Sequence, residues 1–135
     1  MREQSSDRGT AGIMFKSTLK NLPRRVVRAL IFLGRGIKGA FLKEEAFRLE
    51  ILGLGLLGVI LVAVPWPLWK KAALAATYLL IPLAELFNSA LEDICDLVSP
   101  GYHPLVAQAK DKGSAAVLVA ICANVLFLLA LCLSD

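Results

Sequence analysis

Three long apolar segments set the main limit on how this chain can fold. They cover residues 51–69, 72–91 and 114–133, and the first of them contains no charged residue. About 20 helical residues cross the hydrocarbon core of a bilayer, so each segment is long enough to span it. The second segment is interrupted by Pro82, Glu85 and Asn88, and the third has Asn124 as its one strongly polar residue. The sequence therefore predicts an all-α membrane protein with three transmembrane helices.

The composition agrees with that prediction and limits the number of domains. The chain has 135 residues, of which 57% are hydrophobic and 19% are charged. This balance favours a membrane protein over a soluble domain of the same size. A single membrane domain spanning residues 1–135 is the simplest organisation.

The segment before the first span is basic. Residues 1–12 are polar and aperiodic, and we expect a disordered tail there. In residues 15–47, lysines and arginines are interspersed with apolar residues. This pattern predicts an amphipathic helix lying at the surface of an anionic leaflet. We expect an anionic lipid surface as its partner, and no nucleic acid.

The positive charges also predict an orientation. Lysine and arginine are numerous before the first span, Lys70 and Lys71 follow it, Lys110 and Lys112 precede the third span, and none follows the third. Cytoplasmic flanks carry the excess of positive charge, so the N-terminus should be cytoplasmic in the inner (cytoplasmic) membrane of the cell. With three spans, the polar stretch 92–113 then faces the cytoplasm too.

One face of the second apolar segment and its extension is acidic. At about 100° per helical residue, Glu85, Ser89, Glu92 and Asp96 fall within roughly 60° of one another, with Asn88 beside them. We call these five residues the acidic stripe. Ionisable groups within or beside a bilayer are costly and mark functional sites. The alternative is polar contact between helices, or a solvated helix end.

A second acidic group, Glu44, Glu45 and Glu50, precedes the first span. Because the chain crosses the membrane and returns, Glu44 and Glu92 come back to the same interface and can share a divalent ion. Magnesium takes one or two carboxylates together with phosphate oxygens and water. Lys110 and Asp111 add a phosphate-binding cation and another carboxylate. Phosphoryl transfer is one interpretation of these groups, and ion passage is the other.

One glycine pattern and two absent motifs limit the kind of nucleotide site that the chain can have. Gly34, Gly36 and Gly39 match the dinucleotide fingerprint in spacing, but a membrane span follows where an acidic strand end is needed. No Walker A loop and no protein-kinase signature is present, so an ATP site must be of another type.

Three separated motifs resemble the prokaryotic diacylglycerol kinase family in order and spacing. They are Glu44-Glu45-Ala46-Phe47-Arg48-Leu49-Glu50, Glu85-Leu86-Phe87-Asn88-Ser89-Ala90-Leu91-Glu92 and Ala109-Lys110-Asp111-Lys112-Gly113-Ser114-Ala115-Ala116. The resemblance implies a homotrimer of three-span subunits that transfers the γ-phosphate of ATP to the hydroxyl of diacylglycerol, giving phosphatidic acid. A related branch phosphorylates undecaprenol, which remains the alternative substrate, and a non-enzymatic small membrane subunit is the alternative class.

The same resemblance implies roles for individual residues. Glu85 is the expected general base, and Glu44 and Glu92 are the expected ligands of Mg²⁺. The residues expected to bind ATP are Arg25, Glu44, Glu92, Asp96, Tyr102, His103, Lys110 and Asp111. The residues expected to bind the lipid are Ala46, Phe47, Arg48, Leu49, Glu50, Glu85 and Ser114, with Asn88 and Ser89 in support. Gln108, Lys112, Phe41 and Pro82 depart from the usual pattern of the family, which affects the details of nucleotide contact and lipid fit.

Overall fold

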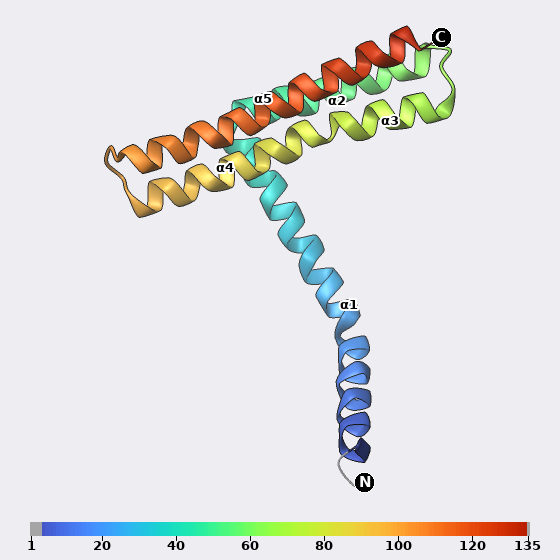
Figure 1. Ribbon diagram of the computed structural model, residues 1–135, viewed down its shortest axis with the longest axis vertical. Helices are drawn as coiled ribbons and strands as arrows, with labels where there is room; N and C mark the ends of the chain where they lie inside the picture. Colours follow the sequence, from blue (N-terminus) through green and yellow to red (C-terminus); the bar gives the residue numbers. More distant parts are fainter. Residues whose placement is uncertain (1–3, 135) are drawn as a thin grey trace. The chain divides into compact units, whose positions relative to one another are not determined.

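The computed structural model describes residues 4–134, and within them the chain is helical apart from short connections (Figure 1). The helices are α1 (Gln4–Lys43), α2 (Glu45–Ala63), α3 (Leu68–Tyr78), α4 (Leu80–Val98) and α5 (Pro104–Leu133). The described residues contain no β-strand. The chain divides between Gly39 and Ala40 into two compact units, and each has its own character.

The first unit is a helix that carries basic and apolar side chains together. The helix begins at Gln4, inside the range 1–12 where we expected a tail, and residues 1–3 lie outside the described part of the chain. From Arg24 onward the basic side chains are exposed, and so are Val26, Leu30 and Leu33. A helix that exposes both kinds of residue suits the boundary between lipid and water.

The second unit contains three helical stretches that are apolar and long enough to cross a membrane. They are Glu45–Ala63, Leu68–Val98 and Pro104–Leu133, with mean hydropathies of 2.1, 1.4 and 2.9. Most of their apolar side chains are exposed on the single chain. Lipid is a favourable surrounding for such side chains, and the backbone polar groups are satisfied within each helix. The predicted all-α fold with three transmembrane helices is confirmed, and the homotrimer stays a prediction.

Proline sets the ends of several helices. Val64 precedes Pro65, and a residue before proline avoids the helical conformation, so α2 ends at Ala63. The chain then turns back and α3 begins after Pro67. Pro82 has no N–H to donate to the carbonyl of Tyr78, and the helix is interrupted at Leu79, between α3 and α4. The interruption lies ahead of Glu85, and α3 and α4 together form one span.

The apolar core of the second unit lies at the end where α2 meets α3. Leu61, Leu74 and Leu131 are buried together, and Leu57 and Phe127 pack against them. Lys70 lies beside this core and donates to the carbonyl oxygens of Leu131 (3.4 Å) and Ser134 (3.3 Å). A cation there stabilises the C-terminal end of α5, where unpaired carbonyls carry partial negative charge.

Two polar contacts fix the middle of the bundle. The Tyr78 hydroxyl donates to the backbone carbonyl oxygen of Glu50 at 3.0 Å, which joins the end of α3 to α2. Asn124 Nδ2 donates to Thr77 Oγ1 at 3.0 Å, which joins α5 to α3. The tyrosine can reach α2 because the residue facing it is Gly53, where a Cβ atom would meet the Tyr78 hydroxyl.

Gly53→Ala is therefore expected to destabilise the protein by about 1–3 kcal/mol, because the added methyl group overpacks this contact. Thermal unfolding in detergent micelles measures the effect, and Gly58→Ala is the matched control, since a Cβ atom at Gly58 has nothing within 4 Å. Combining Gly53→Ala with Tyr78→Phe should restore part of the loss, because the hydroxyl is removed. Equal melting temperatures for the Gly53 and Gly58 variants would contradict this close approach.

Candidate active site

The break between α1 and α2 directs Glu44 toward α4. Glu44 precedes the first residue of α2 in an extended conformation (φ −99°, ψ 117°), and its side chain makes no capping bond to that helix. Instead its Oε1 accepts a hydrogen bond of 3.0 Å from Ser89 Oγ, 45 residues further along the chain. The expected meeting of Glu44 with the acidic stripe of α4 is thus a direct contact.

Glu92 is held by its neighbour one helical turn earlier. Asn88 Nδ2 donates to Glu92 Oε1 at 3.0 Å. Asn88 is buried, with 8% of its surface exposed, and its Oδ1 has no hydrogen-bond partner within the described residues. Asn88 therefore holds Glu92 through Nδ2, while its oxygen makes no hydrogen bond there.

Glu85 is the most deeply placed acid of the stripe. It is 7% exposed and lies on α4 within the second span. Asn88 and Ser89, which bond Glu92 and Glu44, lie one turn further along the same helix. Glu50 lies on α2, and its Oε2 is buried without a hydrogen-bond partner in the part of the chain that the structure describes. A buried carboxylate among others is costly unless a cation or a proton joins them, so this cluster has the character of a functional site.

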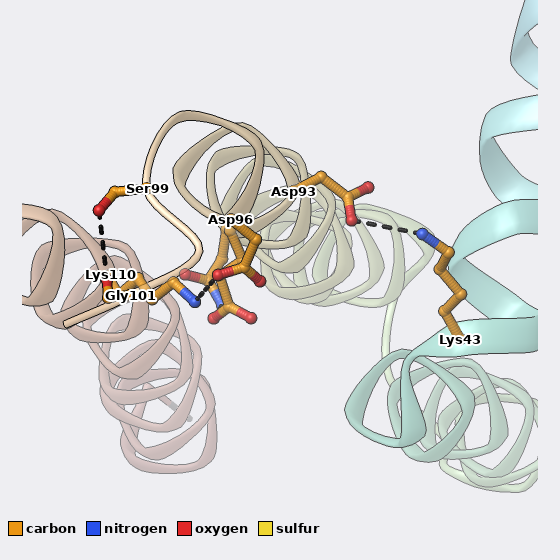
Figure 2. A network of polar contacts seen from close by, with 8 residues as sticks. Lys43, Asp93, Asp96, Ser99, Gly101 and Lys110 are labelled. Carbon is orange, nitrogen blue, oxygen red and sulfur yellow. Dashed lines mark hydrogen bonds and ion pairs between the residues drawn. The ribbon is translucent and has the colours of Figure 1, made fainter.

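Two ion pairs join the end of α4 to different helices, as Figure 2 shows. Lys110 Nζ on α5 is 2.6 Å from Asp96 Oδ1, so the stripe gains a cation at its outer end. Lys43 Nζ is 3.3 Å from Asp93 Oδ1 on another side of the helix. Asp93 is thus turned away from the stripe. Its pair with Lys43 is largely in solvent, where such pairs contribute little to stability, whereas the Lys110 side chain is only 34% exposed.

The other residues predicted to bind ATP or lipid make local contacts or are exposed. His103 Nδ1 accepts a hydrogen bond of 3.2 Å from the backbone N–H of Leu105, so it caps the start of α5. Tyr102 is 88% exposed, and Asp111 is also exposed. Ser114 Oγ donates to the Lys110 carbonyl at 3.2 Å. Arg25 is exposed and belongs to the first unit.

The predicted lipid-binding segment lies on the first turn of α2. Phe47 is buried at 2% exposure, whereas Ala46 and Leu49 are exposed. Arg48 Nη1 donates to the backbone carbonyl oxygen of Phe41 at 3.3 Å, which ties the end of α1 to α2. The segment therefore presents small and apolar surface beside Glu44 and Glu50.

The donor set suits a divalent ion shared with another ligand. The described residues contain no group of three or more metal-ligating side chains that could hold an ion by themselves. Magnesium often takes only one or two protein carboxylates and completes its shell with phosphate oxygens and water. The carboxylates of Glu44 and Glu92, which Ser89 and Asn88 hold by hydrogen bonds, fit such an ion.

Sequence reasoning missed two residues that shape this site. Gly113 on α5 packs directly against the side chain of Asn88, and the hydroxyl of Tyr78 contacts the backbone of Glu50. Neither is charged, and each acts through a contact between elements distant in sequence. In the sequence, Gly113 is a small residue directly before Ser114, within the third of the three motifs.

These features define a multi-pass membrane protein with an acid-rich polar site among α2, α4 and α5. The model of the family described as "Prokaryotic diacylglycerol kinase" matches residues 32–132, a range that contains every predicted site residue except Arg25. The chain belongs to this family and is an enzyme of the kinase class.

Curated relatives from several bacteria are similar to this chain. The diacylglycerol kinase of Escherichia coli (strain K12) is 35% identical over 97 residues, which cover 72% of this chain and 80% of the relative. That of Pseudomonas aeruginosa is 40% identical over 102 residues, covering 73% and 80%. That of Helicobacter pylori (strain 26695) is 33% identical over 103 residues, covering 73% and 77%. The matches therefore extend over most of both chains in each case.

Proposed function

We propose that this protein transfers the γ-phosphate of ATP to the hydroxyl group of diacylglycerol, giving phosphatidic acid. The observation that carries the proposal is the burial of Glu85, at 7% exposure within a membrane span, on the helix whose Ser89 and Asn88 bond Glu44 and Glu92. A lipid hydroxyl anchored at the interface and a nucleotide from the water can both reach such a position. The printed names of the relatives support diacylglycerol as the acceptor.

Glu85 is the proposed general base. Its carboxylate accepts the proton of the lipid hydroxyl while the hydroxyl oxygen forms a bond to the γ-phosphorus. The bond from that phosphorus to the oxygen bridging the β- and γ-phosphates breaks, and ADP leaves. A general base must come within hydrogen-bond reach of the proton that it takes, which explains an acid at membrane depth.

Glu44 and Glu92 are the proposed ligands of Mg²⁺. Bound Mg²⁺ supplies charge neutralisation for the phosphate oxygens of ATP. Ser89 and Asn88 orient the two carboxylates through their hydrogen bonds, so the ligands are held before the nucleotide arrives. This arrangement needs acids from two elements, and neither acid suffices alone.

The remaining assignments divide between nucleotide and lipid. We assign Asp96, Tyr102, His103, Lys110, Asp111 and Arg25 to ATP, and Ala46–Glu50 and Ser114 to the lipid. Lys110 supports the first group, because a lysine beside the stripe supplies positive charge for phosphate. The exposed Ala46 and Leu49 support the second, because they present apolar surface next to Glu44.

We also propose a placement in the cell. The protein resides in the inner membrane as a homotrimer, with its N-terminus in the cytoplasm and α1 on an anionic lipid surface. The exposed arginines between Arg24 and Arg35 support the contact with anionic lipid. The many exposed apolar side chains on the three spans leave room for contact with other subunits as well as lipid.

The choice of lipid is tested by comparing acceptors. Purified protein in mixed micelles receives ATP labelled in the γ-phosphate, magnesium, and either diacylglycerol or undecaprenol. We expect initial rates with diacylglycerol to exceed those with undecaprenol at equal mole fraction. Faster labelling of undecaprenol would assign the chain to the other branch, and labelling of neither lipid would contradict the lipid kinase.

A further inference from the structure

Gly113 on α5 lies against α4 at Asn88. A Cβ atom at Gly113 would meet Asn88 Oδ1 first, and it would lie 3.3 Å from Asn88 Cγ and 3.2 Å from Leu91 Cδ2. Asn88 therefore occupies the space that any side chain at position 113 would need.

This contact sets the direction of the Asn88 amide group. With Oδ1 against the Gly113 backbone, Nδ2 points along α4 to Glu92 Oε1 at 3.0 Å. Asn88 is buried, at 8% exposure, so it has little freedom to adopt another rotamer. A methyl group at position 113 displaces Oδ1 and turns the amide away from Glu92.

We propose that Gly113 is a positioning residue of the active site: by leaving room for the Asn88 amide, it fixes the carboxylate of Glu92. This inference rests on the proposed function, in which Glu92 binds the divalent ion. The residues that orient a metal ligand typically change metal affinity or activity by about 10- to 100-fold when replaced. Gly113 acts one contact further out, through Asn88.

A structural measurement tests the contact independently of catalysis. The chain has three asparagines, Asn21, Asn88 and Asn124, so protein labelled with ¹⁵N in asparagine gives few side-chain amide signals, and Asn88→Asp identifies the relevant one. In the wild type, Glu92→Gln should shift the Asn88 signal. In Gly113→Ala, the signal should already be displaced and should no longer respond to Glu92→Gln. An Asn88 signal that responds to Glu92→Gln equally in both backgrounds overturns the proposal.

The magnesium dependence of the rate tests whether Gly113 affects metal binding through Glu92. We expect Gly113→Ala to raise the magnesium concentration for half-maximal rate by about tenfold, with a smaller change in the KM for lipid. Gly58→Ala is the control and should change neither, because a Cβ atom there meets nothing within 4 Å. If Glu92→Gln raises the magnesium requirement and Gly113→Ala leaves it unchanged, the proposal is overturned. If Glu92→Gln leaves it unchanged too, the metal role of Glu92 in the proposed function is what fails.

A double variant covers the case in which Gly113→Ala does not fold. Asn88→Ala removes the atoms that the new methyl group meets first, so Asn88→Ala/Gly113→Ala should fold and have a melting temperature close to that of Asn88→Ala. A further loss of stability in the double variant, as large as that of Gly113→Ala in the wild type, overturns the contact with Asn88.

Discussion

Replacing Glu85 by glutamine is expected to lower kcat by about 10²- to 10⁴-fold, because general-base catalysis typically contributes this much. Glutamine has nearly the same shape as glutamate but cannot accept the proton of the lipid hydroxyl. The variant should fold, since the change removes a buried charge and leaves the bonds of Asn88 and Ser89 in place. Initial rates in mixed micelles, at saturating ATP and lipid, measure the effect.

Glu45→Gln is the matched control for this loss. Glu45 lies on the first turn of α2, next to Glu44 in sequence, and its side chain is exposed. Its replacement should change kcat less than about twofold, as expected for a surface group outside the site. If Glu85→Gln retains most of the wild-type rate with unaltered helical content, Glu85 is not the base.

The second large effect concerns magnesium. Glu44→Ala and Glu92→Ala should each raise the magnesium concentration for half-maximal rate by about 100-fold or more, because changes to residues that merely orient a ligand already cost about 10- to 100-fold. The KM for lipid should change much less. Rates measured over a series of magnesium concentrations at fixed ATP separate the two quantities.

Asp93→Ala supplies the comparison for those variants. Asp93 lies one residue beyond Glu92, but its carboxylate pairs with Lys43 and not with the stripe. The pair is exposed, so its loss should be nearly neutral for stability and for magnesium. Equal magnesium requirements for all three variants would count against Glu44 and Glu92 as ligands.

Apolar runs in the sequence predict the number of spans, but not the ends of the helices. The third spanning helix, α5, begins at Pro104, ten residues before the apolar run at Ser114. The run marks the part suited to lipid, whereas lysine, glutamine and alanine are good helix formers and continue the helix into the water. The first spanning helix, α2, also begins before its apolar run, and it ends at Ala63, ahead of the end of the run, because Pro65 follows.

Helical periodicity similarly predicts part of the site. The stripe from Glu85 to Asp96 follows from 3.6 residues per turn, and the structure bonds Glu92 to Asn88 as neighbours one turn apart. The hydrogen bond between Glu44 and Ser89 depends on the axial register of α2 against α4, which no local sequence pattern specifies. The role of Gly113 depends in the same way on the packing of α5 against α4.

The central claim is that Glu44 and Glu92, from two different elements, bind one divalent ion together with ATP. The most direct measurement uses protein labelled with ¹³C in the glutamate carboxylates, loaded with Mn²⁺ and a non-hydrolysable ATP analogue, and studied by electron–nuclear double resonance. We expect a strong ¹³C coupling from directly bound carboxylates, which is lost in Glu44→Gln/Glu92→Gln and retained in Asp93→Asn. A coupling that is absent from the wild type, or that persists in the double variant, would contradict the claim.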